Sequence, residues 1–346
     1  MRRRSPLPDP LAPVARLAER VYRAEVARRN LRFDAGRGVV TIDRPVISVG
    51  NLSVGGTGKT PMVQRLVGWL REAGHRPAIA MRGYRARGGL SDEAAAHADA
   101  FSGEVPVVAQ PDRLEGLLRL FATDAGRAVD VVVLDDGFQH RRLARQLDLV
   151  LVDASRPFAA DRCLPAGWLR EPPASLSRAS AVVVTHAELV DASGLGGVLH
   201  AVRAHAPASV HAVCAHAWDG LVVADESSEE TRPVAWLEGR RVAAACAIAH
   251  PEAFFAAAER AVGGPLAGRL ALRDHDPIGP GTRARLAELA RGCEVLLVTE
   301  KDWTKLRRRD PQGLGVPVAR PALTLAFREG ESDLRERVVA AAGLSI

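Results

Sequence analysis

Cysteine is scarce in this 346-residue sequence. Its four cysteines stand far apart along the chain, and no two of them form a CxxC pair. This arrangement argues against both a disulfide framework and a zinc site, so a reducing compartment is expected. Aromatic residues are also few, at 4%, and they do not alternate with basic residues. The sequence therefore predicts no stacking platform for nucleic acid and no nucleic-acid partner.

Long apolar runs are absent as well. No 18 consecutive residues are apolar, so no segment is expected to span a membrane. Hydrophobic residues nevertheless make up 47% of the chain and charged residues only 25%, which is typical of a globular protein. The length predicts about two domains.

Lysine is the rarest cation. Only Lys59, Lys301 and Lys305 occur among the 47 lysines and arginines, so almost every cation is arginine. The formal net charge of +6 indicates an anionic partner, and because the few aromatics argue against nucleic acid, a nucleotide or an acidic lipid is expected. In such a chain, a lysine in a glycine-rich turn indicates a site that needs a compact ammonium group.

That lysine lies in the most informative stretch, residues 46–61. A β-branched run, a glycine-rich turn and a helical pattern follow one another, as in a phosphate-binding loop. Lys59 would then reach the β- and γ-phosphates and Thr60 would bind Mg²⁺. The strict pattern has glycine where this chain has Ser53, so an ordinary glycine-rich turn is the alternative. The expected nucleotide contacts are Ser53, Val54, Gly55, Gly56, Thr57, Gly58, Lys59 and Thr60.

A second strong pattern ends at two carboxylates. Residues 129–134 are mostly apolar and predict a buried parallel strand, which places Asp135 and Asp136 at its C-terminal end. Ligands bind at that end of a doubly wound sheet. The carboxylates are therefore expected to hold Mg²⁺ or its waters beside the phosphate-binding loop. An acidic turn without a metal is the alternative.

Strands and helices alternate along most of the chain, which predicts an α/β protein with a doubly wound parallel sheet. The composition changes near residues 217–235, where a polar, acidic segment lies between two short apolar runs. We expect a hairpin-like connector there. The first domain would comprise residues 1–216, and a smaller α/β domain would comprise residues 217–346.

Residues 11–29 predict an amphipathic helix. Its apolar face comprises Leu11, Val14, Ala18, Val21 and Tyr22, while Arg16, Arg20 and Arg23 lie on another face. The helix would either pack on the domain or lie on an anionic lipid surface with its arginines at the headgroups. The residues alone leave both interpretations open.

Six motifs occur in one order along the chain: residues 49–61, 82–84, 135–141, 164–172, 274–275 and 299–306. In this set, and over nearly its whole length, the chain resembles the tetraacyldisaccharide 4′-kinases of lipid A biosynthesis. Ser53 matches that family's own departure from the strict loop pattern. Ser91 and Ala94 depart from the family, which usually has Gly-Asp-Glu-Pro at this place.

The resemblance implies transfer of the ATP γ-phosphate to the 4′-hydroxyl of a tetraacylated glucosamine disaccharide 1-phosphate, with Mg²⁺ as cofactor. It implies a P-loop NTPase-like domain joined to a smaller α/β/α domain by a two-stranded hinge. It also implies a peripheral position on the cytoplasmic face of a Gram-negative inner membrane, reached through residues 11–29. Further nucleotide contacts are implied for Arg113, Gln139, His140 and Arg170, and metal handling for Thr60, Asp135, Asp136 and Glu171.

The resemblance also implies the groups that handle the proton. Asp92 would act as the general base for the sugar hydroxyl, and His275 would pair with it and tune its proton affinity. General acid–base assistance of this kind is worth roughly 10²–10⁴-fold in rate. The alternatives are a solvated loop carboxylate for Asp92 and a structural hydrogen bond for His275.

Two other functions remain open from the sequence. One is a P-loop kinase for a soluble sugar or nucleoside. The other is a nucleotide-dependent switch or partitioning ATPase with a protein or DNA partner. The basic amphipathic N-terminus and the motifs outside the nucleotide site favour the lipid kinase over both. ATP consumption in step with phospholipid product distinguishes it from a switch.

Overall fold

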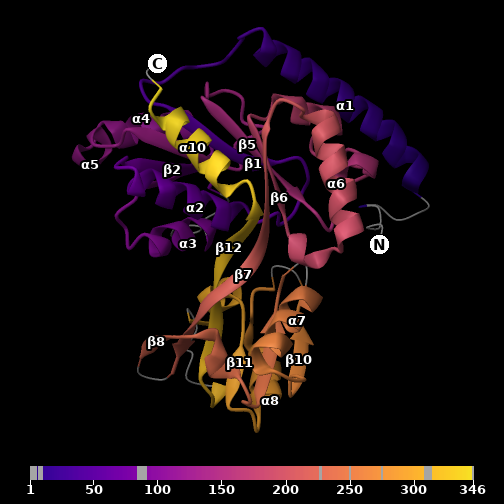
Figure 1. Ribbon diagram of the computed structural model, residues 1–346, viewed down its shortest axis with the longest axis vertical. Helices are drawn as coiled ribbons and strands as arrows, with labels where there is room; N and C mark the ends of the chain where they lie inside the picture. The colour runs from indigo at the N-terminus through magenta and orange to yellow at the C-terminus, as the bar shows by residue number, and fades with distance from the viewer. Residues whose placement is uncertain are drawn as a thin grey trace. The chain divides into compact units, whose positions relative to one another are not determined.

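The computed structural model describes residue 6 and residues 11–83, 92–225, 228–248, 251–273, 276–307 and 314–344; for Asp92 it describes the backbone alone. The chain forms two compact units. Unit 1 comprises Met1–His216 and Leu325–Ile346, and unit 2 comprises Ala217–Thr324. The chain enters unit 2 within strand β7 (Val210–Ala224) and leaves it within strand β12 (Val318–Glu329) (Figure 1).

Unit 1 is built on a parallel sheet with the strand order β7–β6–β5–β1–β4–β2–β3. Strand β1, which leads into the phosphate-binding loop, lies in the interior of this order. The result confirms the predicted α/β class and its mostly parallel sheet. The remaining strands are β1 (Val46–Asn51), β2 (Pro77–Met81), β3 (Val107–Ala109), β4 (Val131–Asp135), β5 (Leu147–Asp153) and β6 (Ala181–Thr185).

Successive residues of each strand point to opposite faces of this sheet, so both faces are apolar. Helices cover both of them. In β4, Val131 and Val133 pack with helix α2 (Lys59–Glu72), whereas Val132 and Leu134 pack with helix α4 (Arg113–Phe121). Every residue of β1, β2, β4 and β6 is buried, as expected for the central strands of a doubly wound sheet. The other helices of unit 1 are α1 (Ala12–Asp34), α3 (Asp92–Ala100), α5 (Asp124–Arg127), α6 (Ala192–His205) and α10 (Glu331–Ala342).

Helix α1 has a buried face and an exposed apolar face. The buried residues are Ala15, Glu19 and Val26. Most of the predicted apolar face points to solvent, with 65% of Val14 and 68% of Val21 exposed. Tyr22, at the edge of that face, is half-buried and packs against the core of unit 1. It also continues to Asp34, beyond the predicted end at residue 29.

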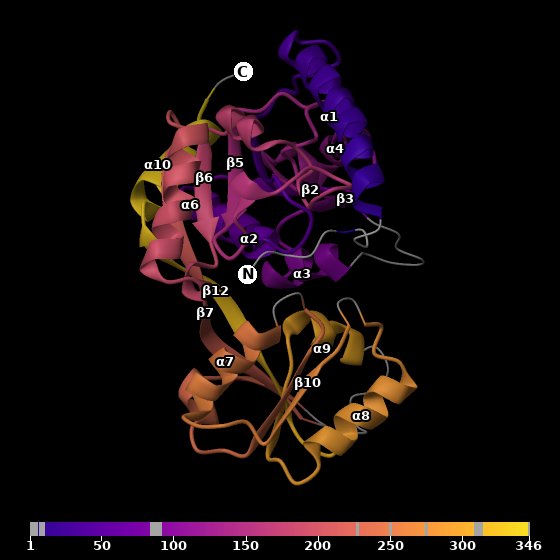
Figure 2. The same cartoon turned by 90° about the vertical axis from the view of Figure 1, so that its right-hand side faces the viewer.

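Unit 2 contains parallel strands in the order β10–β9–β11–β12, and the far end of β7 pairs with β8 in antiparallel fashion. This antiparallel pair is the hairpin predicted near residues 217–235. Helix α7 packs on one face of the parallel strands, and helices α8 and α9 pack on the other (Figure 2). The elements are β8 (Glu229–Arg232), β9 (Val242–Cys246), α7 (Pro251–Val262), β10 (Gly268–Ala271), α8 (Pro280–Ala290), β11 (Val295–Leu297) and α9 (Glu300–Arg307).

The end of the chain returns to unit 1. The sequence analysis assigned residues 217–346 to one C-terminal domain, whereas Leu325–Ile346 belongs to unit 1. The physical reason lies in the core. Leu325, Leu334 and Val338 are buried with the apolar residues of α2 and β1. Residues 217–324 alone form unit 2.

Candidate active site

The phosphate-binding loop and the predicted carboxylates lie at the same edge of the unit 1 sheet. Strand β1 lies between β4 and β5, and Val49 is in register with Asp135. Parallel strands end at the same edge, so the loop that follows Asn51 lies beside the turn at Asp135 and Asp136. The two strongest sequence patterns are thereby brought together.

The loop turns through two left-handed positions, with φ angles of 116° at Gly55 and 79° at Gly58. Glycine adopts such angles without steric cost, which explains why both positions are glycine. Gly58 leads directly into α2, so the first N–H groups of that helix are available to an anion at the loop. Ser53 forms an antiparallel bridge with Leu169, and this extended position requires no glycine.

Side chains from β1, β6 and β7 contact the loop and support its shape. The Asn51 amide donates to the hydroxyl of buried Thr57 at 2.9 Å, and the Thr185 hydroxyl donates to the Thr57 carbonyl at 3.0 Å. The ring of His216 lies so close to Gly58 that a Cβ there would be 2.8 Å from two ring atoms. The loop shape is thus fixed by packing as well as by its glycines.

Two cations converge on Asp136. One amino group of the Arg170 guanidinium donates to both carboxylate oxygens, at 2.7 and 2.8 Å, and the Lys59 ammonium lies 3.5 Å from one of them. Burial alone would raise the pKa of Asp136, but the charges of Lys59 and Arg170 outweigh it and lower that pKa. The ionised carboxylate therefore holds both cations at the edge of the phosphate-binding loop.

Three further predicted nucleotide contacts surround this carboxylate turn. The buried Arg113 donates to the main-chain carbonyl of Asp136 at 3.2 Å, and burial lowers its pKa without removing its charge. The Gln139 amide donates to the Asn51 carbonyl at 3.0 Å. Burial, together with the charge of Arg113, lowers the pKa of His140 from 6.5 to about 4. His140 is therefore a neutral imidazole near pH 7.

Asp135 forms a buried pair that the sequence did not reveal. One of its carboxylate oxygens lies 3.0 Å from Nε2 of His97, whose side chain is 0% exposed. The other oxygen, Oδ1, is buried and has no hydrogen-bond partner in the part of the chain that the structure describes. A free carboxylate oxygen beside a phosphate-binding loop fits Mg²⁺, which prefers oxygen ligands. Within the described ranges, no group of three or more His, Cys, Asp or Glu is arranged to hold a metal by itself.

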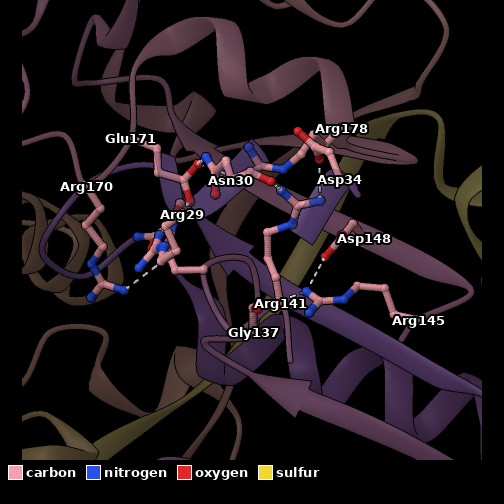
Figure 3. A network of polar contacts seen from close by, with 12 residues as sticks. Arg29, Asn30, Asp34, Gly137, Arg141, Arg145, Asp148, Arg170, Glu171 and Arg178 are labelled. Atoms are coloured by element: carbon pink, nitrogen blue, oxygen red, sulfur yellow. Dashed lines mark hydrogen bonds and ion pairs between the residues drawn. The ribbon is translucent and has the colours of Figure 1, made fainter. Parts of the chain in front are cut away.

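Glu171 has different surroundings. Its carboxylate accepts from the Asn30 amide at 2.9 Å and lies 2.9 Å from Arg178 and 3.6 Å from Arg29 (Figure 3). The side chain is fully buried. Arg29 and Asn30 belong to α1, so Glu171 connects that helix to the loop that carries Arg170. Its predicted part in metal handling stays a prediction.

The predicted general base and its partner cannot be placed. Asp92 begins helix α3, but its side chain lies outside the described residues. Residues 274–275 also lie outside them, so the pairing of Asp92 with His275 stays a prediction.

Sequence reasoning missed several residues that shape this site: Tyr22, Asn30, His97, Thr185 and His216. His97 carried one usable signal, because it is a lone histidine in the alanine-rich segment that follows Asp92. The other four stand in unremarkable helix and strand patterns. They reach the site only through the tertiary fold, which their local sequence does not encode.

Comparisons with known proteins agree with this geometry. The family described as Tetraacyldisaccharide-1-P 4'-kinase matches residues 11–341. A tetraacyldisaccharide 4'-kinase from Geobacter sulfurreducens is 37% identical over 86% of this chain and 84% of its own length. One from Chlorobaculum parvum is 33% identical over 94% of this chain and 93% of its own length.

A solved structure extends the likeness to three dimensions. The crystal structure of LpxK from Aquifex aeolicus in complex with ATP is 28% identical to this chain, with a TM-score of 0.71. The match covers 96% of this chain and 98% of that one. Motifs, fold and relatives agree, and this chain belongs to the tetraacyldisaccharide-1-P 4'-kinase family.

Proposed function

We propose that this chain transfers the γ-phosphoryl group of ATP to the 4′-hydroxyl of a tetraacyldisaccharide 1-phosphate, a step of lipid A biosynthesis. The observation that carries the proposal is the convergence of Lys59 and Arg170 on Asp136 beside the phosphate-binding loop. The names of the relatives and the ATP complex of LpxK support the same reaction.

The loop and its cations would carry most of the catalysis, because phosphoryl transfer depends mainly on positioning and charge stabilisation. Backbone N–H groups from residue 53 to residue 60 would bind the phosphates at the start of α2. Lys59 and Arg170 would supply positive charge where negative charge develops on the transferred group. Asp136 would keep both side chains at the loop.

Mg²⁺ would be held by oxygen ligands at the same edge of the sheet. Thr60 stands in the first turn of α2, and Asp135 offers a buried carboxylate oxygen without a partner in the described ranges. Asp136 would bind the ion or its waters, and Glu171 is included on the resemblance alone. When bound, the ion would neutralise charge on the phosphates. Glu171→Gln should then raise the Mg²⁺ concentration needed for half-maximal activity; an unchanged metal titration would remove Glu171 from this set.

For the chemical step, we propose Asp92 as the base that accepts the proton of the sugar hydroxyl and His275 as its partner. A double-mutant cycle on kcat tests this pairing. Asp92→Ala and His275→Ala should each lower kcat by roughly 10²-fold or more, and the double variant should lose little beyond either. If Asp92→Ala stays within a few-fold of the parent, the base lies elsewhere.

The acyl chains of the acceptor require access to a lipid surface, and α1 offers one means of attachment. Val14, Leu17 and Val21 of this helix are exposed, and Arg16 and Arg20 are exposed beside them. This is the pattern of a helix that lies in a membrane interface. No helix in the described ranges has the length and apolar character needed to cross a bilayer. We propose peripheral attachment through residues 11–29 to the cytoplasmic face of a Gram-negative inner membrane.

The direct test is mass spectrometry of a tetraacyldisaccharide 1-phosphate incubated with the protein, ATP and Mg²⁺. The expected product carries one additional phosphate, and Lys59→Ala should produce none. ATP hydrolysis without any phospholipid product would instead support a nucleotide-dependent switch. Parallel incubation with a water-soluble sugar acceptor tests the soluble-sugar kinase in the same assay.

A further inference from the structure

The buried face of α1 holds one particular loop of unit 1, residues 161–171. The Glu19 carboxylate is only 5% exposed, and it accepts a hydrogen bond from the main-chain N–H of Cys163 at 3.1 Å. Further along the helix, the Tyr22 hydroxyl donates to the main-chain carbonyl of Arg170 at 2.8 Å. The Asn30 amide donates to the Glu171 carboxylate at 2.9 Å. The helix therefore contacts the loop at three places along its length.

The protonation state of Tyr22 and the burial of Glu171 favour these contacts. Burial raises the pKa of Tyr22, so its hydroxyl remains protonated and acts as a donor throughout the physiological range. Glu171 is buried, and its charge is compensated by Arg29 of α1 and by Arg178. Removing one partner of a buried, charged hydrogen bond costs more than removing an exposed one. The loop is thus tied to α1 at both ends, by the Glu19 carboxylate at Cys163 and by Tyr22 and Asn30 at Arg170 and Glu171.

The same loop is also bound to the phosphate-binding loop. The main-chain N–H of Arg170 donates to the Leu52 carbonyl at 2.7 Å, and the N–H of Val54 donates to the Trp168 carbonyl at 2.8 Å. The side chain of Arg170 donates hydrogen bonds to the Asp136 carboxylate. Residues 168–171 therefore lie between α1 and the nucleotide site, with main-chain or side-chain hydrogen bonds to each.

We infer that α1 is a positioning element of the nucleotide site, and that Tyr22 and Asn30 are its positioning residues. They fix the backbone at Arg170 and Glu171, so that the Arg170 guanidinium stands ready at the phosphates beside Lys59. This gives α1 a role that its outward apolar face does not provide. The inference deepens the proposed function and rests on it for ATP binding at the phosphate-binding loop, not for the identity of the acceptor.

The test measures the affinity of the full chain for a fluorescent ATP analogue in the presence of Mg²⁺. Tyr22→Phe removes one hydroxyl and keeps the ring, so nucleotide affinity should fall about threefold to tenfold, the effect of one hydrogen bond. Asn30→Ala should act in the same direction. The matched control is Glu25→Gln, an exposed residue of α1 that pairs with Arg28 of the same helix; it should leave the affinity unchanged.

A double-mutant cycle separates positioning from a general loss of structure. Arg170→Ala removes the guanidinium that Tyr22 is inferred to place, so adding Tyr22→Phe to it should cause little further loss of affinity. The midpoint of thermal unfolding should change little in Tyr22→Phe. Additive losses in the cycle, or an unchanged affinity in Tyr22→Phe, would overturn the inference. No acceptor is used, so failure of the proposed acceptor would leave this result standing.

Discussion

Two neutral histidines lie close to the nucleotide site. Burial lowers the pKa of His140 to about 4, and burial together with the neighbouring His186 lowers the pKa of His216 to about 3. The His186 and His216 rings stack with their centroids 4.3 Å apart, and His216 lies directly behind Gly58. Protonation of His216 would place a positive charge on a ring that packs against Gly58 of the phosphate-binding loop.

This arrangement predicts a loss of stability in acid. An unfolded histidine titrates near 6.5, so below that pH the unfolded chain binds a proton that folded His216 does not accept until about pH 3. Stability should therefore fall as the pH drops from about 6.5 towards 3, by up to about 1.4 kcal/mol per pH unit for this histidine. His216→Gln should make the decline of the unfolding midpoint with pH less steep. The exposed control His200→Gln should follow the parent, and equal slopes in all three proteins would contradict the assignment.

Lys59 provides a second prediction at the scale of single residues. Lys59→Ala should abolish phosphoryl transfer and leave the far-ultraviolet circular dichroism spectrum unchanged, because the half-buried side chain lies outside the hydrophobic core and its ion pair is with Asp136. Lys59→Arg tests whether the site needs a compact ammonium; we expect a loss of at least tenfold in kcat/KM. Near-normal turnover in Lys59→Ala would refute the assignment of the phosphate-binding loop.

The sequence revealed the residues proposed to bind phosphate more readily than those that hold them in place. Residues 53–60 follow the spaced pattern expected of one short loop that surrounds an anion. Tyr22 and Arg170, in contrast, are 148 positions apart and meet through a single hydroxyl and a main-chain carbonyl. A tyrosine in an amphipathic helix has the same local pattern whether or not it makes such a contact. Positioning residues of this kind become visible only in the folded chain.

At the scale of elements, α1 shows that periodicity can predict a helix without predicting which side of it packs on the protein. The apolar pattern located the helix, but two sides of it carry apolar residues. Only the structure shows that Ala15 and Val26 face the protein and that Val14, Leu17 and Val21 face away. The last turn was missed because residues 30–34 are mostly polar, and Asn30 and Asp34 are held there by contacts with Glu171 and Arg141.

The exposed face of α1 predicts a separable membrane function. Replacing Val14, Leu17 and Val21 together by asparagine should abolish sedimentation with vesicles that contain anionic lipid, since their side chains are more than 60% exposed. The unfolding midpoint should stay within a few degrees of the parent. Raising the salt concentration should weaken binding of the unmodified protein, because the arginines of the helix attract anionic headgroups through screened charges. A triple variant that still sediments with vesicles would exclude this face.

At the scale of the whole molecule, the core of unit 1 depends on the end of the chain. Leu334 and Val338 of α10 are fully buried in the core beside α2. Leu334→Ala should lower the free energy of unfolding of unit 1 by about 2–5 kcal/mol through the cavity that it creates. The exposed neighbour Arg337→Ala should change it by less than about 0.5 kcal/mol. Denaturant unfolding measures both, and equal effects would contradict the packing of α10 against this core.

The division into units was the least predictable feature. The rhythm of strands and helices after residue 217 continues smoothly through unit 2, and β12 carries no break in its pattern at the boundary between Thr324 and Leu325. Which sheet a strand joins depends on partners that are far away in the sequence. The sequence pattern of residues 325–344 therefore continues that of unit 2. Only the core that buries these residues shows that they belong to unit 1.

The return of α10 to unit 1 has a consequence for how the protein is made. A ribosome delivers residues 1–216 first, then all of unit 2, and only afterwards the segment that completes the core of unit 1. Domains usually fold in the order of their synthesis. Here the apolar surface of α2 that belongs under α10 stays uncovered while unit 2 is translated and can already fold. During that interval the uncovered apolar surface of unit 1 favours aggregation, and translation that stops before α10 would leave the core of unit 1 incomplete.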